Sequence, residues 1–311
     1  MLSIRSQKIY DEFWKFAANR QELFYNKLRG VSPLTNDEIL KEFKFCNAYR
    51  VLDRVSQYLI SNVIYCGNFS AQDTIFRIVF FKIFNLPSTW ESLKNKVGEI
   101  CLNNFDFTKY SKALGELKQK QAIYNNAYIS CANKAFGFDA KHDNHLKLLE
   151  KMFLIDNLSD KILKCENMQK AFELFINYPL IGNFMAYQLI TDINYSDAVN
   201  WSEAEFTVAG PGSIRGINKV FSKFNSYEEA IVECYNRQEF EFKRLGLNFK
   251  YIKNHSLQYI DIQNLFCEFD KYCRQAHPEL KSNRTKIKTK YKPTNKIIDY
   301  KLPPKWNAEL M

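Results

Sequence analysis

Hydrophobic residues recur at helical spacing along most of the chain, and short polar or glycine-containing breaks separate these segments. The apolar rows of residues 7–29 contain Phe13, Trp14, Phe16, Ala17, Leu23, Phe24 and Leu28. The same spacing predicts helices over residues 47–65, 71–84, 90–96, 108–121, 143–155, 159–177, 214–224, 226–244 and 259–276. Thr35 to Glu38 resembles the cap of a short additional helix. Residues 122–131 fit either a loop or a short strand. The pattern therefore predicts a mostly α-helical protein.

Composition supports this fold class. The 311 residues include only 10 Gly and 8 Pro, so chain breakers are scarce, and 15% of the residues are aromatic. A chain of this length can bury a substantial core in one large domain or in two lobes. We expect a helical region over residues 1–280, with two lobes and a cleft, followed by a tail over residues 281–311.

The charge is concentrated in that tail. The chain carries a formal net charge of +10, and residues 281–311 contain nine Lys or Arg against two Asp or Glu. A basic segment is typical of proteins that bind a polyanion such as nucleic acid. A solvated tail without a partner is the alternative.

Eight cysteines are scattered without a Cys-x-x-Cys pair. With no secretory leader at the start, this favours a reduced, cytoplasmic protein. The most apolar stretch, residues 75–86, is too short to span a bilayer and contains Arg77 and Lys82. His142 and His145 lack further ligands at zinc spacing. We expect a monomer with no metal, no cofactor and no membrane partner.

Residues 178–186, Tyr-Pro-Leu-Ile-Gly-Asn-Phe-Met-Ala, lie between two predicted helices. The segment resembles the hairpin of helix-hairpin-helix DNA glycosylases, with Leu180 where that family usually has glycine. Such a turn exposes backbone N–H groups at the positive end of the next helix, which can hold a DNA phosphate. We expect Ile181, Gly182 and Asn183 to contact the DNA backbone. An ordinary connection between helices is the alternative.

The sequence Gly210-Pro211-Gly212-Ser213 predicts a second phosphate contact. Two glycines around a proline make a rigid loop with few side chains, which allows close approach of a phosphate or sugar. No Gly-Lys-Ser/Thr follows, so the loop is not a Walker loop. Arg215 and Lys219 on the following helix are expected to add positive charge. A simple turn is the alternative.

A polar stripe is predicted on the helix over residues 47–65. Asn47, Arg50, Arg54 and Gln57 recur there at spacings that bring side chains to one helix face. An arginine in this stripe can bind a phosphate through two hydrogen bonds. An exposed, salt-bridged helix face is the alternative.

Several segments in the same order resemble one family. They are residues 44–60, 83–90, 184–196, 206–217 and 265–272. The family is that of the α-glutamyl/putrescinyl thymine pyrophosphorylases, whose helical domain also occurs beside hydroxymethyluracil DNA kinases. It is regarded as a divergent branch of the helix-hairpin-helix glycosylases and is associated with hypermodified thymine in phage DNA. The resemblance implies a DNA glycosylase-like fold and double-stranded DNA with modified bases as the partner.

The function that this resemblance implies first is a DNA glycosylase. It would evert a hypermodified or glucosylated base of phage DNA and excise it, as in anti-phage defence. Excision needs a carboxylate near C1′ of the sugar. The family pattern places this acid near Ala209, so nearby acids are the candidates: we favour Glu205, with Glu203 and Asp192 as alternatives. The side chains expected to contact the base are Asn47, Arg50, Arg54, Gln57, Tyr187, Gln188 and Tyr195.

Two other functions fit the same residues. A transferase would replace pyrophosphate on 5-pyrophosphoryloxymethyluracil with an amine, and would need Arg50, Arg54, Arg215 and Lys219 around the leaving group. A reader of modified DNA would bind without catalysis. The absence of a kinase P-loop in these residues favours the glycosylase among the three.

Overall fold

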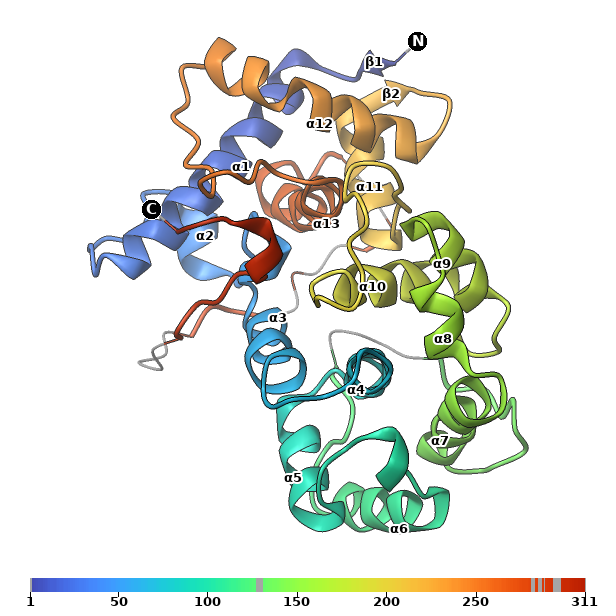
Figure 1. The fold of residues 1–311 in the computed structure, drawn as a ribbon. Coiled ribbons are helices and arrows are strands. Elements are labelled where there is room, and N and C mark those ends of the chain that lie inside the picture. Colours follow the sequence, from blue (N-terminus) through green and yellow to red (C-terminus); the bar gives the residue numbers. More distant parts are fainter. Residues whose placement is uncertain are drawn as a thin grey trace. The chain divides into compact units, whose positions relative to one another are not determined.

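The computed structural model describes residues 2–126, 131–280, 283–284, 287, 289–292 and 298–310. Within these residues the chain is mostly helical and has one two-stranded sheet (Figure 1). The chain divides into two compact units. Unit 1 comprises Met1–Asp53, Glu203–Leu302 and Trp306–Met311, and unit 2 comprises Arg54–Ser202 and Pro303–Lys305. The prediction of a mostly α-helical protein is confirmed.

Unit 1 is built around its last long helix. Its elements are β1 (Ser3–Ile4), α1 (Gln7–Leu28), α2 (Glu38–Glu42), η1 (Arg50–Leu52), α11 (Pro211–Val220), β2 (Phe221–Lys223), α12 (Tyr227–Arg244) and α13 (Tyr259–Ala276). Helices α1, α11 and α12 all pack on α13 (Figure 1). Aromatic rings fill this core: Phe13 of α1 stacks on Phe266 of α13, with ring centroids 4.4 Å apart.

Two glycines bring α11 and α13 into close contact. A Cβ atom added to Gly216 would lie 2.0 Å from the backbone oxygen of Phe266. A Cβ atom added to Gly212 would lie 2.2 Å from Sγ of Cys267. Both distances are far below van der Waals contact, so this packing requires glycine at both positions.

Unit 2 contains the middle of the chain. Its elements are α3 (Arg54–Leu59), η2 (Ile60–Ile64), α4 (Ala71–Phe84), α5 (Pro87–Val97), η3 (Leu102–Asn104), α6 (Phe107–Lys118), α7 (Lys141–Glu150), η4 (Lys151–Ile155), α8 (Leu158–Leu163), α9 (Met168–Ile176) and α10 (Asn183–Ile193). A further 3-10 turn, η5 (Pro304–Trp306), lies near the C-terminus. Helix α4 is buried on every side from Ile75 to Phe84, which explains its nearly continuous apolar sequence.

The two charged residues inside α4 are buried with partners. Arg77 has no exposed surface, and its guanidinium donates to the backbone oxygens of Val63 and Ile100 at 3.1 and 2.8 Å. Nζ of Lys82 lies 2.8 Å from Oδ2 of Asp192 on α10. Buried charges need such partners because removal from water is costly.

Three of the predicted helices differ from the structure. The expected helix over residues 47–65 is interrupted at Asp53, whose carboxyl group accepts from the backbone N–H of Asn47 at 2.8 Å. A side chain that bonds the backbone in this way competes with helix formation. The helix expected over residues 159–177 is two helices, because Asn167 caps the start of α9. The helix expected over residues 214–224 ends at Val220, and β2 follows and pairs with β1.

The possible strand at residues 122–131 falls partly on residues 127–130, which lie outside the described residues. Residues 122–126 form no strand. Among the helices that the structure describes, none is both long and apolar enough to cross a membrane.

Candidate functional site

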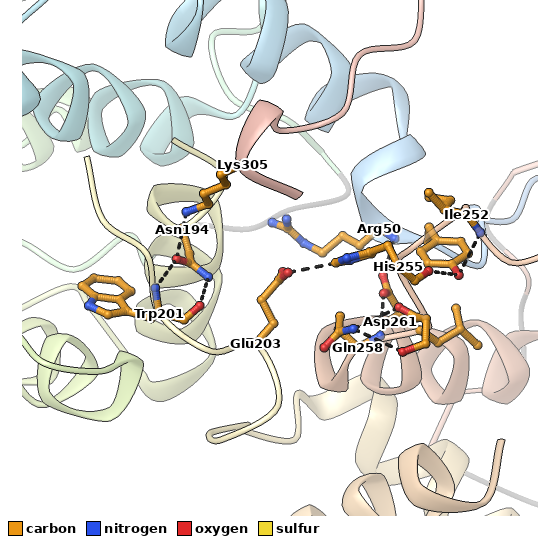
Figure 2. Close-up of polar contacts among 12 residues, drawn as sticks. Arg50, Asn194, Trp201, Glu203, Ile252, His255, Gln258, Asp261 and Lys305 are labelled. Atoms are coloured by element: carbon orange, nitrogen blue, oxygen red, sulfur yellow. Dashed lines mark hydrogen bonds and ion pairs between the residues drawn. The ribbon is translucent and has the colours of Figure 1, made fainter. Parts of the chain in front are cut away.

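A buried histidine and a glutamate face each other in unit 1 (Figure 2). Nε2 of His255 lies 3.7 Å from Oε2 of Glu203, and the two side chains are 10% and 12% exposed. This separation is longer than a hydrogen bond. Within the described part of the chain, Nε2 of His255 has no hydrogen-bond partner. A buried polar atom without a partner costs free energy, which makes this nitrogen a candidate for contact with a ligand.

The imidazole ring of His255 is held on its other sides. Trp306, at the end of η5, stacks on it with ring centroids 3.7 Å apart and an angle of 14° between the planes. Tyr49 fixes the backbone, since its hydroxyl donates to the oxygen of His255 at 2.7 Å and accepts from the N–H of Ile252 at 3.2 Å. Burial lowers the pKa of His255 to about 4, so the ring is neutral at pH 7.

A buried carboxyl group connects this region to Arg50. Asp261 is 3% exposed and accepts from the backbone N–H of Arg50 at 2.7 Å and from that of Gln258 at 2.9 Å. The second contact belongs to the capping box that begins α13. Burial raises the pKa of Asp261 to about 7, although both backbone hydrogen bonds act in the opposite direction.

Arg50 itself is 6% exposed, and Figure 2 shows its side chain extending toward the region where Glu203 lies. The arrangement therefore places an imidazole, a carboxyl group and a guanidinium group in one region of unit 1. Such a set can move a proton and balance negative charge.

We expect the variant His255→Gln to lose less stability than the wild-type protein when the pH falls from 7 to 5. Between about pH 6.5 and pH 4 the unfolded chain binds a proton that the folded His255 excludes. The contribution of His255 to stability is therefore present at pH 7 and decreases as the pH falls toward 4, by about 2 kcal/mol at pH 5. Urea unfolding of both proteins at the two pH values measures the difference.

The change in stability with pH must be compared between wild type and His255→Gln, because two buried carboxyl groups change the stability of both proteins in the opposite direction. The folded-state pKa of Asp261 is raised to about 7, and burial raises that of Asp53 to about 6. Their contributions to stability are present in acid and are lost as the pH rises through these values. An equal pH dependence in wild type and variant would show that His255 is not held neutral by burial.

The residues predicted for catalysis and binding are divided between the two units. Those in unit 1 are Asn47, Arg50, Glu203, Glu205, Gly210, Gly212, Ser213, Arg215 and Lys219. Those in unit 2 are Arg54, Gln57, Ile181, Gly182, Asn183, Tyr187, Gln188, Asp192 and Tyr195. The predicted polar stripe does not form as one helix face, because Asn47 and Arg50 precede the break at Asp53 and Arg54 and Gln57 follow it.

The three candidate acids lie in different surroundings. Glu203 is in the site with His255. Glu205, which the sequence favours, is exposed. Asp192 is 1% exposed and forms an ion pair with Lys82 in the core of unit 2. Of the three acids, Glu203 is therefore the one that lies beside His255.

The glycine-rich loop before α11 is occupied by contacts within unit 1. The N–H of Gly210 donates to Oε1 of Gln263 at 3.2 Å, and Gly212 packs on Cys267. Ser213 has no exposed surface. These contacts give the glycines a role in helix packing, and a phosphate contact at this loop stays a prediction.

The connection between α9 and α10 is tight. Leu180 has a φ angle of +67°, the left-handed conformation that glycine adopts most easily. Gly182 caps α10, and the space around its Cα is open. On α10 the predicted base contacts Tyr187 and Gln188 are 1% and 5% exposed, so they belong to the core of unit 2.

His255, Asp261 and Trp306 are not among the residues predicted from the sequence. His255 carries no local motif. The spacing of Gln258 and Asp261 is that of a capping box, which was a detectable signal for α13. Trp306 belongs to the segment predicted as a basic tail, and nothing in the sequence indicates that it stacks on a histidine.

A family profile and a known protein that match this chain bear the same name. The profile described as "5-hmdU DNA kinase, helical domain" matches residues 7–282. The chain is similar to a 5-hmdU DNA kinase of Bacillus phage SP10, with 25% identity over 292 residues. The match covers 86% of this chain and 45% of that relative, so the chain spans less than half of the relative's length. No solved structure matches the chain.

These matches correct the predicted enzyme class. The prediction of a DNA glycosylase, a hydrolase of the N-glycosidic bond, is wrong, because the profile and the relative both bear the name of a kinase, which is a transferase. The resemblance to the helical domain found beside hydroxymethyluracil DNA kinases is confirmed.

Proposed function

Since the chain belongs to the family of the 5-hmdU DNA kinase helical domain, we propose that it binds DNA containing modified 5-hydroxymethyluracil and transfers a group at the methylene carbon of that base. The proposed step replaces pyrophosphate on 5-pyrophosphoryloxymethyluracil with an amine. The observation that carries the proposal is the buried, unpartnered Nε2 of His255, which faces Glu203 at 3.7 Å.

The reaction requires the modified base to leave the helix. Eversion of a base costs a few kcal/mol, which contacts in a pocket must offset. Trp306 already stacks on one face of His255, so a planar ring fits against the imidazole. A pyrimidine that takes the place of the Trp306 indole would make the same kind of contact.

The chemistry follows from the three side chains of the site. The amine nitrogen forms a bond to the methylene carbon, and the bond from that carbon to the pyrophosphate oxygen breaks with its electron pair. The amine gives its proton to neutral His255, and the Glu203 carboxyl group stabilises the resulting imidazolium. The Arg50 guanidinium balances the negative charge on the departing pyrophosphate.

The proposed step is distinct from the phosphorylation of the hydroxymethyl group of the base. Residues 1–311 contain no Gly-x-x-x-x-Gly-Lys-Ser/Thr sequence, which is the P-loop of many kinases. The proposed step starts from a base that already carries pyrophosphate.

The test is the mass of the nucleosides after reaction. The chain is incubated with putrescine and with duplex DNA that carries 5-pyrophosphoryloxymethyluracil, and the DNA is digested to nucleosides. We expect a nucleoside in which the amine has replaced pyrophosphate. Because proton transfer contributes about 10²–10⁴-fold to such reactions, Glu203→Gln and His255→Gln should each lower the rate by about 10²-fold or more.

The matched control is Glu205→Gln, which makes the same chemical change at an exposed position in the same segment. It should retain the wild-type rate within about twofold, because surface substitutions have small effects. If the chain binds the modified duplex but no new nucleoside forms, the chain is a non-catalytic reader of modified DNA and not a transferase. Equal rates for Glu203→Gln and wild type would show that the site at Glu203 and His255 takes no part in the reaction.

A further inference from the structure

Three cations in unit 1 surround a single buried carboxylate, on the facing surfaces of α11 and α13. Asp270 has no exposed side-chain surface. Nε of Arg215 lies 2.9 Å from its Oδ2, and Nζ of Lys219 lies 3.0 Å from its Oδ1. Arg274 also contacts Asp270. One negative charge therefore lies among three positive charges, and the cluster keeps an excess of positive charge.

Helical spacing accounts for this cluster. Arg215 and Lys219 are one turn apart on α11, and Asp270 and Arg274 are one turn apart on α13, so each pair shares a helix face. The close packing at Gly216 brings the two faces together. Burial acts to raise the pKa of Asp270, but hydrogen bonds from Arg274, Arg215 and Lys219 outweigh it and lower the pKa. The carboxylate is thus ionised at neutral pH and holds the cations in place.

A cavity of about 350 Å³ opens beside this cluster. Its lining includes Arg5, Arg215, Asn218 and Lys219, with Glu279 as the acidic member. Arg5 is placed by its backbone N–H, which donates to the oxygen of Val220 at 2.8 Å, and by its Nε, which donates to the oxygen of Asn218 at 3.0 Å. Glu279 contributes one negative charge to the lining, against the three positive charges of Arg5, Arg215 and Lys219. The cavity retains an excess of positive charge.

This cavity is separate from the site at His255. Asp261, which bonds Arg50, and Asp270, which bonds Arg215, lie nine residues apart on α13. At a rise of 1.5 Å per residue, the backbones of these two residues are about 14 Å apart along the helix axis. The cavity and the site at His255 therefore lie at different levels of α13.

We propose that this cavity binds a phosphate-bearing small molecule, such as a diphosphate. Guanidinium groups bind phosphate oxygens through paired hydrogen bonds, and Arg5 and Arg215 supply two of them. A concave site of this volume is in the range of small-ligand pockets. Lys219 is only 4% exposed, so solvent screens its charge at the cavity lining weakly.

The experiment is calorimetric titration of the full chain with inorganic pyrophosphate, without DNA, so its result does not depend on the proposed reaction. Asn218→Asp adds a negative charge at an exposed lining position, and should weaken pyrophosphate binding by at least about tenfold. Arg5→Gln, also at an exposed position, should weaken it as well. Asn236→Asp, an exposed position on α12, makes the same charge change outside the lining and should leave binding unchanged.

Competition with an unmodified DNA duplex identifies the source of the phosphate. Pyrophosphate binding that is weakened by Asn218→Asp and is unaffected by the duplex supports the proposal. Displacement of pyrophosphate by the duplex would assign the cavity to the DNA backbone and overturn it. Absence of pyrophosphate binding, or equal binding by wild type and Asn218→Asp with unchanged circular dichroism, would also overturn it.

Discussion

Replacing Gly216 with alanine is expected to lower the free energy of unfolding of unit 1 by at least about 3 kcal/mol. The new Cβ atom would lie 2.0 Å from the backbone oxygen of Phe266, and a backbone atom cannot move aside as a flexible side chain can. Helices α11 and α13 would have to separate, which disturbs the aromatic core around Phe266. Chemical denaturation followed by circular dichroism measures the change.

The matched control is Gly115→Ala on α6, where no atom lies within 4 Å of the added Cβ. Alanine is the better helix former by about 1 kcal/mol, so this variant should be slightly more stable than wild type. The same substitution thus has opposite effects at the two helical positions. A Gly216→Ala protein as stable as wild type would mean that α11 and α13 do not pack this closely.

The glycines of residues 210–216 show which part of a packing contact can be predicted from the sequence. The sequence indicates that another group lies very close to the backbone of Gly212, and in the structure one does. The group that lies against Gly212 is Cys267 of α13, a contact that the local sequence does not indicate. Local sequence specifies the need for a small residue, but only the tertiary packing specifies what lies against it.

Much of the helical fold follows from local pattern. The predicted range for residues 71–84 agrees with α4, and that for residues 259–276 agrees with α13. Both helices have strong signals at their starts: Ser70 caps α4 and a capping box begins α13. The predicted helix over residues 47–65 is continuous only from Arg54 onward, because the side chain of Asp53 bonds the backbone at Asn47, a local contact that periodicity alone does not reveal.

The candidate site could be predicted only in part, since its members come from separate parts of the sequence. Glu203 was a candidate because it lies near the position where the family pattern places the acid, and Arg50 because it belongs to the predicted polar stripe. His255 lies in a connection before α13, and its buried surroundings come from Tyr49 and Trp306, which are remote in the chain. The chemical character of this histidine is a product of burial, so no spacing rule could have indicated it.

Removing one partner of the buried pair Lys82–Asp192 is expected to lower the stability of unit 2 by about 3–5 kcal/mol. The two side chains are 6% and 1% exposed, and Nζ of Lys82 lies 2.8 Å from Oδ2 of Asp192. In Lys82→Met or Asp192→Leu, the remaining charge would be left in an apolar core without its counter-charge. The double variant should recover most of the loss, because it leaves neither charge behind.

Lys170→Met is the control for the two single variants and the double variant. Lys170 pairs with Glu173 in the same unit at a largely exposed position. Its effect should be below about 1 kcal/mol. The cycle also decides the role of Asp192, which the sequence offered as a catalytic acid. A structural role predicts that Asp192→Leu loses stability and that the double variant regains both stability and nucleoside conversion. Should the double variant regain stability while conversion stays absent, Asp192 would be part of the reaction and Glu203 would not be the only functional acid.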